Sequence, residues 1–140
     1  MAVIIKSCIK NEGHKTLAKV EIGAEQFDLL VSGTIDEIEK RINEETSVEL
    51  DFSEVVQFNR CKVKDDECGY FKTNKRDVIG LRGQIRNVVP GGHDVIYDLY
   101  VGEATSCLCL VSSDIGARSL REGDGVEVLV RNLVLFPVDY

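Results

Sequence analysis

The 140-residue chain contains the same pattern twice, displaced by about 79 positions. Residues 12–23 align with 91–102 without a gap, and the two histidines, His14 and His93, fall on each other, each directly after a glycine. After two short slips in register, the alignment continues with 48–50 on 126–128 and 55–58 on 133–136. This pattern predicts an internal duplication. Each copy would hold about 55 to 60 residues, near the lower limit for one hydrophobic core, so we expect the copies to pack together or interlock.

Each copy contains five short apolar segments typical of strands, several of which alternate strictly with polar residues. They span 3–5, 18–22, 27–31, 48–52 and 55–58 in the first copy, and 81–89, 95–101, 105–111, 126–130 and 132–136 in the second. A short helix is expected after each third strand, at 34–42 and at 113–120. Thr34 and Glu37 form a capping box for the first helix. Five strands with one helix in this position suit a small barrel of the oligonucleotide/oligosaccharide-binding (OB) type.

Between the copies, residues 59–79 are polar and carry Cys61 and Cys68. We therefore divide the chain into a first unit at 1–58, a linker at 59–79 and a second unit at 80–140. The linker is expected to include an extra edge strand at 69–72. The predicted fold class is all-β with short helices, as two tandem five-stranded OB-like barrels related by internal duplication and pseudo-twofold symmetry. Exchange of an edge strand between the barrels is an option within this fold.

Charge and composition narrow the function. The net charge of -7 repels phosphate backbones and anionic membranes, so nucleic-acid binding would need a local basic patch. The chain has no run of 18 apolar residues, and its start has no apolar core of a signal peptide. Its five cysteines are an odd set of low density, which fits a reducing compartment. We expect a cytoplasmic protein that does not enter a membrane.

Four pieces of the second half, taken in order, resemble a TOBE domain. They are 81–85, 97–102, 120–128 with the turn Gly123-Asp124-Gly125, and 131–136. The resemblance covers 81–137, and the first half shares it only through the repeat. TOBE domains are five-stranded OB-type barrels at the ends of ATP-driven transporter subunits and, in tandem, in the molybdate-binding molbindins. The resemblance implies a cytoplasmic binding protein for a small oxyanion such as molybdate or tungstate, with no other cofactor.

Two departures from the family pattern qualify what the resemblance implies. The chain has no phosphate-binding G-x-x-x-x-G-K-[ST] loop, so it would be a free-standing pair of TOBE-like units rather than a transporter ATPase. Molbindins also carry a Ser-Ala-Arg-Asn segment before the first glycine, and that segment contributes to oxyanion binding. Residues 75–80 here are Lys-Arg-Asp-Val-Ile-Gly, which weakens the molybdate inference.

Hydroxyl groups at equivalent places in the two copies are the leading candidates for anion ligands. Ser32 with Thr34, and Ser112 with Ser113, each enter a helix whose first N–H groups are free. Two cations on the first strands, Lys6 and Arg82, would add positive charge to a site between the units. The favoured alternative is that the hydroxyls cap helices and that the cations are solvated surface residues. The nearby carboxylates of Asp36 and Asp114 also count against an anion.

The remaining polar residues form no catalytic set, so no enzyme is expected. His14 and His93 invite a metal interpretation, but each follows a glycine at a hairpin turn, where an exposed polar residue is ordinary. Cys107 and Cys109 share one strand face and could bind a metal or form a bridge. The favoured interpretation is that they are small buried apolar side chains.

Several partner classes therefore remain open. The first is a small anion bound by tandem TOBE-like units. The second is a protein, either a basic partner or a transporter component, docked on a protein–protein interaction module. A homo-oligomer is compatible with both. Single-stranded nucleic acid ranks last, because the one patch of aromatic and basic residues is Tyr70-Phe71-Lys72 with Lys75-Arg76.

Overall fold

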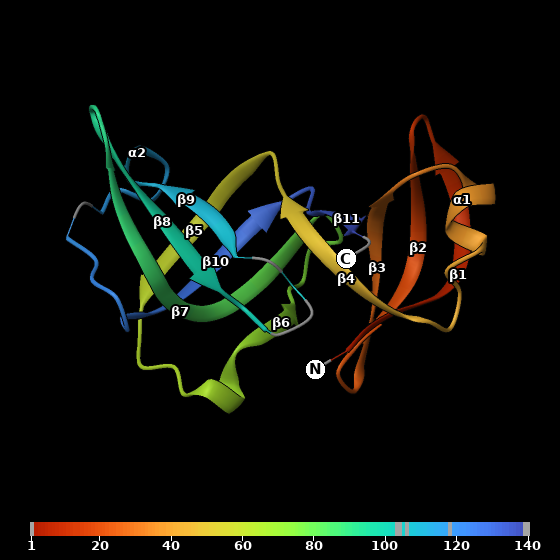
Figure 1. Cartoon of the computed structure of the whole chain (residues 1–140), viewed down its shortest axis with the longest axis horizontal. Coiled ribbons are helices and arrows are strands. Elements are labelled where there is room, and N and C mark those ends of the chain that lie inside the picture. The colour runs from red at the N-terminus through yellow and green to blue at the C-terminus, as the bar shows by residue number, and fades with distance from the viewer. Residues whose placement is uncertain (1, 103–104, 106, 118, 139–140) are drawn as a thin grey trace.

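The structure, a computed structural model, describes residues 2–102, 105, 107–117 and 119–138, and strands dominate it (Figure 1). Positions 106 and 118, which belong to an expected strand and an expected helix, lie outside the described residues. The strands are β1 Val3–Glu12, β2 Lys15–Ile22, β3 Glu25–Ser32, β4 Glu45–Asp51, β5 Glu54–Arg60, β6 Gly69–Lys72, β7 Val78–Gly91, β8 Asp94–Tyr100, β9 Leu108–Val111, β10 Gly125–Arg131 and β11 Val134–Val138. The helical elements are α1 Ile35–Glu39, the 3-10 helix Asp65–Glu67 and α2 Ser112–Ile115.

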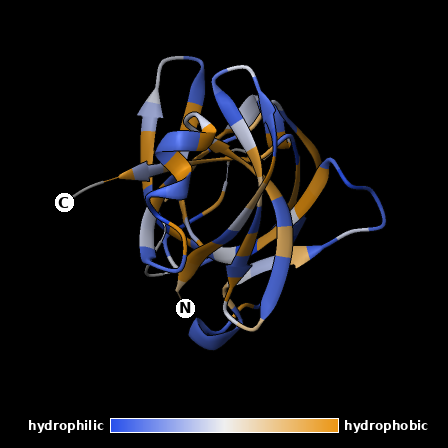
Figure 2. Ribbon diagram, turned by 90° about the vertical axis from the view of Figure 1, so that its right-hand side faces the viewer, coloured by the Kyte–Doolittle hydropathy of each residue, from blue (hydrophilic) through white to orange (hydrophobic). Residues whose placement is uncertain are grey.

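The first sheet is a closed barrel of five strands in the order β1-β2-β3-β11-β4. β1, β2 and β3 form antiparallel hairpins, and β4 returns to pair with the start of β1. The C-terminal strand β11 closes the barrel, because it runs parallel to β3 on one side and antiparallel to β4 on the other. Figure 2 looks at this end of the molecule and shows hydrophobic and hydrophilic residues alternating along the strands, as one buried and one exposed face require.

The second sheet is a half-barrel in the order β5-β10-β7-β8-β9, with β6 paired to the first part of β7. Its two end strands, β5 and β9, do not pair with each other among the described residues. α2 contacts β5, β8 and β9 and so lies across this gap. The extra strand expected at 69–72 is confirmed as β6.

Each half of the chain supplies its last strand to the other sheet. Apart from β6, each half of the described chain has five strands, β1 to β5 in the first half and β7 to β11 in the second. Counted within its half, the strand order is fifth, fourth, first, second, third in both sheets: β11-β4-β1-β2-β3 in the barrel and β5-β10-β7-β8-β9 in the second sheet. β5 pairs with β10, and β11 pairs with β4. The sheets therefore do not follow the boundaries at 58 and 80, because β5 lies in the second sheet and β11 lies in the first.

β4 and β5 pair with β11 and β10 to form one two-stranded ribbon that passes through both sheets. Arg131 faces Glu54 in the β5–β10 ladder, and Val134 faces Asp51 in the β4–β11 ladder, so the register is the same on both sides of the crossing. Within the β5–β10 ladder it shifts between Leu129 and Val130. At the crossing, the Ser53 amide donates to the Arg131 carbonyl at 2.9 Å. The Asn132 side-chain amide donates to Ser53 Oγ at 3.2 Å.

A single hydrophobic cluster extends through both sheets, from Val3 and Val20 at one end to Tyr97 and Val128 at the other. This continuity follows from the exchange, because β11 carries the fully buried Leu135 into the first barrel. The two sheets therefore share one core.

Both helices are shorter than the sequence predicts. α1 ends at Glu39, because the Arg41 amide bonds the Ile38 carbonyl and Asn43 turns the chain with φ of 65°. α2 ends at Ile115, because Gly116 adopts the left-handed conformation with φ of 67°. No helix among the described residues is long and apolar enough to cross a membrane.

The expectation that Cys107 and Cys109 are buried is wrong, since both side chains are exposed. Leu108 and Leu110 point into the core and are each 1% exposed. Side chains alternate along a strand, so the cysteines on either side of Leu108 point outward.

Candidate functional site

A pocket of about 460 Å³ lies where the outer face of β2 and β3 meets β6, the loop after it and the start of β7. We call it the junction pocket. It is lined by Leu17, Lys19, Gln26, Phe27, Asp28, Lys72, Thr73, Asn74, Lys75, Arg76, Val78 and Ile79. Its size is within the usual range for ligand sites, about 300 to 1,000 Å³.

The β2–β3 wall follows from strand alternation. Thr16 and Ala18 point into the barrel and are fully buried, so Leu17 and Lys19 point outward into the pocket. Lys19 and Asp28 face each other across the β2–β3 ladder, so both side chains lie on the outer face, but they form no ion pair.

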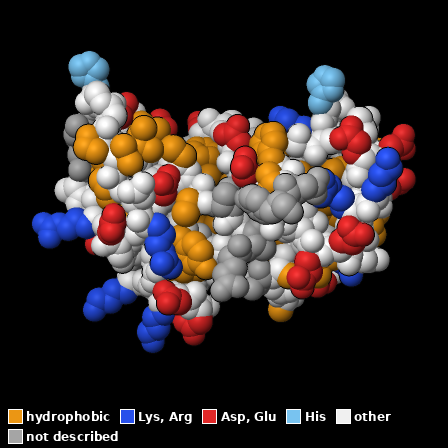
Figure 3. All heavy atoms as spheres, in the orientation of Figure 1, with side chains coloured by type: hydrophobic (Ala, Val, Ile, Leu, Met, Phe, Trp, Pro, Cys, Tyr) orange, Lys and Arg blue, Asp and Glu red, His pale blue; other side chains and the backbone are white. Residues whose placement is uncertain are grey.

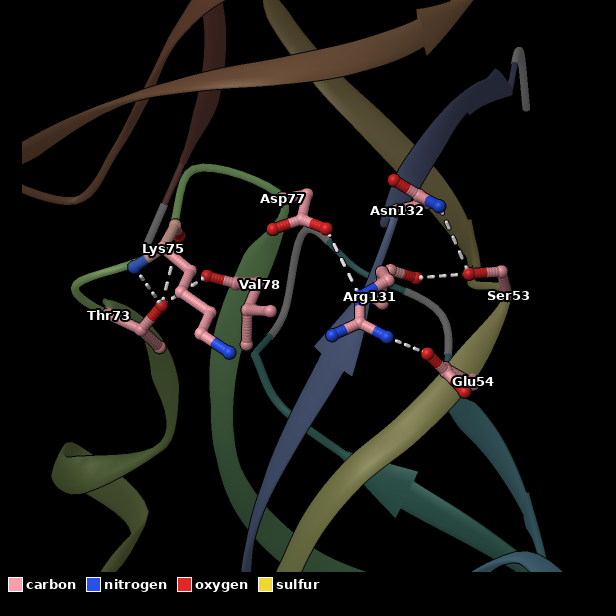
Figure 4. Close-up of polar contacts among 8 residues, drawn as sticks. All are labelled: Ser53, Glu54, Thr73, Lys75, Asp77, Val78, Arg131 and Asn132. Carbon is pink, nitrogen blue, oxygen red and sulfur yellow. Dashed lines mark hydrogen bonds and ion pairs between the residues drawn. The ribbon is translucent and has the colours of Figure 1, made fainter.

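The opposite wall is the loop 73–77, and its two ends are fixed by hydrogen bonds (Figure 4). At the first end, Thr73 Oγ1 donates to the Val78 carbonyl at 2.7 Å and accepts from the Lys75 amide at 3.2 Å. The hydroxyl has one proton, so the Lys75 carbonyl at 3.0 Å from Thr73 Oγ1 is a secondary contact.

The other end of the loop is tied to the strand crossing. Arg131 Nε donates to Asp77 Oδ2 at 3.1 Å, and the Asn132 amide donates to the Asp77 carbonyl at 2.8 Å. Arg131 also pairs with Glu54 through Nη1. Lys75 and Arg76 therefore project from a loop whose ends are held by the rigid part of the fold.

The junction pocket is electropositive in a protein of net charge -7. Its charged lining residues are Lys19, Lys72, Lys75 and Arg76 against Asp28. Within the described part of the chain, none of these four cations makes an ion pair, whereas Arg60, Arg82 and Arg131 all do. A cleft lined by one sign of charge concentrates ions of the opposite sign, so the pocket would attract an anion.

Lys72 is positioned by an aromatic cluster beneath it. Its ammonium lies 5.6 Å from the centroid of the Phe27 ring, and the rings of Phe27 and Tyr70 are 6.2 Å apart. The Tyr70 hydroxyl shares a buried hydrogen bond of 2.9 Å with Thr105 Oγ1. Burial raises the pKa of the Tyr70 phenol far above its ordinary value, while the bond to Thr105 lowers it by less.

The structure uses Thr34 as a helix cap, as the capping box predicts. Thr34 Oγ1 accepts from the Glu37 amide at 3.3 Å and donates to Glu37 Oε1 at 3.1 Å. Ser32 lies at the end of β3 and lines a separate pocket of about 590 Å³ beside α1. The charged residues of that pocket are Glu37, Glu44, Lys40 and Arg41, so cations and carboxylates balance there.

Ser112 and Ser113 differ in environment. Ser112 is 2% exposed, and its hydroxyl accepts from the Val95 amide at 2.9 Å and donates to Asp94 Oδ1 at 3.2 Å. That hydroxyl joins β8 to α2. Ser113 is exposed on α2.

The two candidate cations also lie apart from the junction pocket. Lys6 is exposed on β1 at a register shift between Ile5 and Ser7. Arg82 on β7 donates from Nε and Nη2 to Glu127 Oε2, both at 3.0 Å, and its guanidinium lies 4.8 Å from the Phe71 ring centroid. The six candidates thus do not line one pocket: Ser32 lines the pocket beside α1, and none lines the junction pocket.

The described histidines, cysteines and carboxylates form no group of three or more that could hold a metal ion. His14 and His93 lie exposed at the β1–β2 and β7–β8 turns, as expected for turn residues (pale blue in Figure 3). Desolvation raises the pKa of the Cys107 and Cys109 thiols, and Asp98 adds to the effect. Raised pKa values disfavour the thiolate that metal binding and nucleophilic attack require.

Part of the junction pocket was visible in the sequence. Lys72, Lys75 and Arg76 belong to the one patch of basic and aromatic residues in the sequence, the patch that would be needed for binding single-stranded nucleic acid. Nothing local pointed to Lys19, because its position opposite the 73–77 loop depends on how the sheets meet.

Compared with known proteins, the chain matches no family model, no curated protein and no solved structure.

Proposed function

We propose that this protein is a non-enzymatic binding protein for an anion, held in the junction pocket. The observation that carries the proposal is the set of four cations without ion pairs, facing one carboxylate, in a chain of net charge -7. Lys75 and Arg76 would meet the anion from the anchored loop, and Lys72 and Lys19 from either side. Molybdate and tungstate are the anions that the TOBE resemblance implies.

The strand order supports the finer part of the proposal, that the two halves are duplicated OB-type units of the TOBE kind. Both sheets repeat one order of strands, with the fifth strand exchanged. The bulged residues Lys6 and Arg86 also lie near equivalent places in β1 and β7, after Ile5 and Ile85. A pair of units would create its ligand site at their junction, where the pocket lies.

Thermal unfolding with millimolar molybdate, tungstate, sulfate and phosphate, at fixed ionic strength, tests the proposal. An anion present at about 100 times its Kd should stabilise the fold by about 2.7 kcal/mol. For a chain of this size, that corresponds to a rise of about 5 to 10 °C in Tm. The shift should be strongly reduced in the double variant Lys75→Gln/Arg76→Gln, because two of the four cations are lost.

The matched control is Lys62→Gln/Arg121→Gln, which removes the same charge at exposed positions outside the pocket. It should keep the wild-type shift. Equal shifts in the two double variants would place the anion elsewhere and overturn the proposal. The absence of a shift with every anion in the panel would count equally against it.

An alternative function, as a protein–protein interaction module, is favoured by one surface feature. Val89, Ile96 and Val111 are neighbours across β7, β8 and β9, and Val89 is 44% exposed. Figure 3 shows hydrophobic side chains gathered at the end of the molecule where β8 and β9 lie. If no anion binds, this face is the first place to test by mutation in partner pull-downs.

A further inference from the structure

The junction pocket is lined by apolar as well as charged side chains, and we call the apolar set its floor and the charged set its rim. The floor residues are Leu17, Phe27, Val78 and Ile79. Phe27, Val78 and Ile79 belong to the core, at 2%, 2% and 6% exposed, so the half-buried Leu17, which faces outward from β2, presents most of the accessible apolar surface. Lys72 of the rim contacts the floor directly, because its ammonium lies over the Phe27 ring.

A tetrahedral oxyanion is too small to use this floor. Such an ion occupies on the order of 100 Å³, about three times the share of one water molecule in the liquid. The pocket measures about 460 Å³, so a bare oxyanion on the rim would leave water against the apolar side chains. This pocket has both apolar and charged lining residues, so an organic ligand could contact both sets, and its apolar part would displace that water.

We propose that the ligand is an organic anion with an apolar body, an inference that rests on the anion-binding function proposed above. Its apolar body lies on Leu17, Phe27 and Ile79. Its charged group lies against Lys72, Lys75 and Arg76. A phosphate monoester of an aromatic or aliphatic group has this chemistry.

Two phosphate monoesters test the inference on the full-length protein. Methyl phosphate and 1-naphthyl phosphate carry the same charged group, and both are dianions at pH 8, because the second pKa of such esters is near 6. They differ in the apolar body alone. Burying about 60 Å² of apolar surface is worth about tenfold in affinity, so 1-naphthyl phosphate should bind at least about tenfold more tightly by titration calorimetry.

The variant Leu17→Asn tests the apolar floor alone, because it replaces an apolar side chain by a polar one and leaves the charged rim unchanged. It should reduce the affinity ratio of 1-naphthyl phosphate over methyl phosphate to a few-fold, because the loss falls mainly on the ester with the larger apolar body. Lys75→Gln/Arg76→Gln should instead weaken both ligands. In amide NMR spectra of the wild type, only 1-naphthyl phosphate should shift the signals of Leu17 and Phe27, a readout that does not depend on a variant folding.

The outcomes separate this inference from the function on which it rests. Equal binding of the two esters in the wild type would overturn the organic-anion inference and leave anion binding intact. An undiminished naphthyl preference in Leu17→Asn, or naphthyl-induced shifts away from the pocket, would overturn it as well. Failure of both esters and of all inorganic anions to bind would overturn the proposed function itself.

Discussion

Tyr70 is the residue with the most strongly perturbed environment near the pocket. Burial keeps its phenol neutral in the fold, while the same phenol in the unfolded chain ionises near its ordinary pKa of 10. Since the folded pKa is raised, the stabilisation from this group is fully present below pH 10 and is lost as the pH rises above it. Above pH 10, ionisation of the phenol lowers the free energy of the unfolded chain, while the folded chain stays neutral at this site.

Tyr70→Phe removes this dependence. At pH 8 the variant should be less stable by about 1 to 2 kcal/mol, because the hydrogen bond with Thr105 is lost. At pH 11 the difference in free energy of unfolding between wild type and variant should be smaller by about 1.4 kcal/mol. The reason is that pH 11 lies one unit above the pKa of Tyr70 in the unfolded chain, and only the wild type has this phenol to ionise on unfolding. Urea unfolding at both pH values measures this. A gap that stays constant from pH 8 to pH 11 would show that Tyr70 titrates normally in the fold.

Sequence patterns predicted residues with local partners better than residues with distant ones. The Thr34 cap was found because Thr34 and Glu37 are three positions apart. The role of Ser112 was missed, because Ser112 begins α2 and its partners Asp94 and Val95 lie on β8, far away in the sequence. Local sequence therefore correctly indicated a cap at Thr34 and gave no sign that the Ser112 hydroxyl is fully engaged.

Among the elements, β7 is the most constrained, because it pairs with β6, β10 and β8 along its length. Gly83 lies where β7 passes from β10 to β8. A Cβ added there would lie 2.0 Å from the Tyr100 carbonyl oxygen, which is backbone and cannot rotate away. This close approach explains a glycine in the middle of a strand.

Gly83→Ala should therefore destabilise the fold by about 2 to 3 kcal/mol, as overpacking of a core does. Gly92→Ala is a useful comparison, since a Cβ at this turn meets nothing within 4 Å and its cost is the strain of φ at 69° alone. Chemical denaturation of both variants gives the two values. A Gly83→Ala protein as stable as the Gly92→Ala protein would mean that β7 and β8 can separate without cost.

Element positions were largely predictable, because strand periodicity is local and strong. The expected strand segments overlap the observed strands, and β6 was placed correctly at 69–72. The expected helices were too long, because backbone turns at Asn43 and Gly116 end them earlier than their side-chain patterns suggest. Periodicity specifies which face is buried and says little about where a helix stops.

For the whole molecule, the exchanged strands make the halves dependent on each other. Fragments 1–60 and 61–140 should each fail to unfold cooperatively, because the first lacks β11 and the second lacks β5. Mixing them in equal amounts should restore the circular dichroism and the single transition of the intact chain. A fragment 1–60 that melts cooperatively by itself would show that β1 to β4 suffice for one barrel.

The meeting of the two sheets explains why the site could not be read from the sequence. Lys19 and Arg76 line one pocket although they lie far apart in the chain. Alternation shows that Lys19 faces outward and the loop composition shows that Arg76 is exposed. Which outward face lies against which loop depends on how strands far apart in the sequence pair, and local sequence does not determine that pairing.

The late arrival of β11 has a consequence for synthesis in the cell. β11, the strand that lies between β3 and β4, is synthesised about 80 residues after β4 and about 100 residues after β3. At about 5 to 20 residues per second, the first barrel stays open for roughly 4 to 16 seconds with two strand edges unpaired. Such edges invite pairing with other nascent chains, so chaperone contact during translation should centre on the first half of this protein.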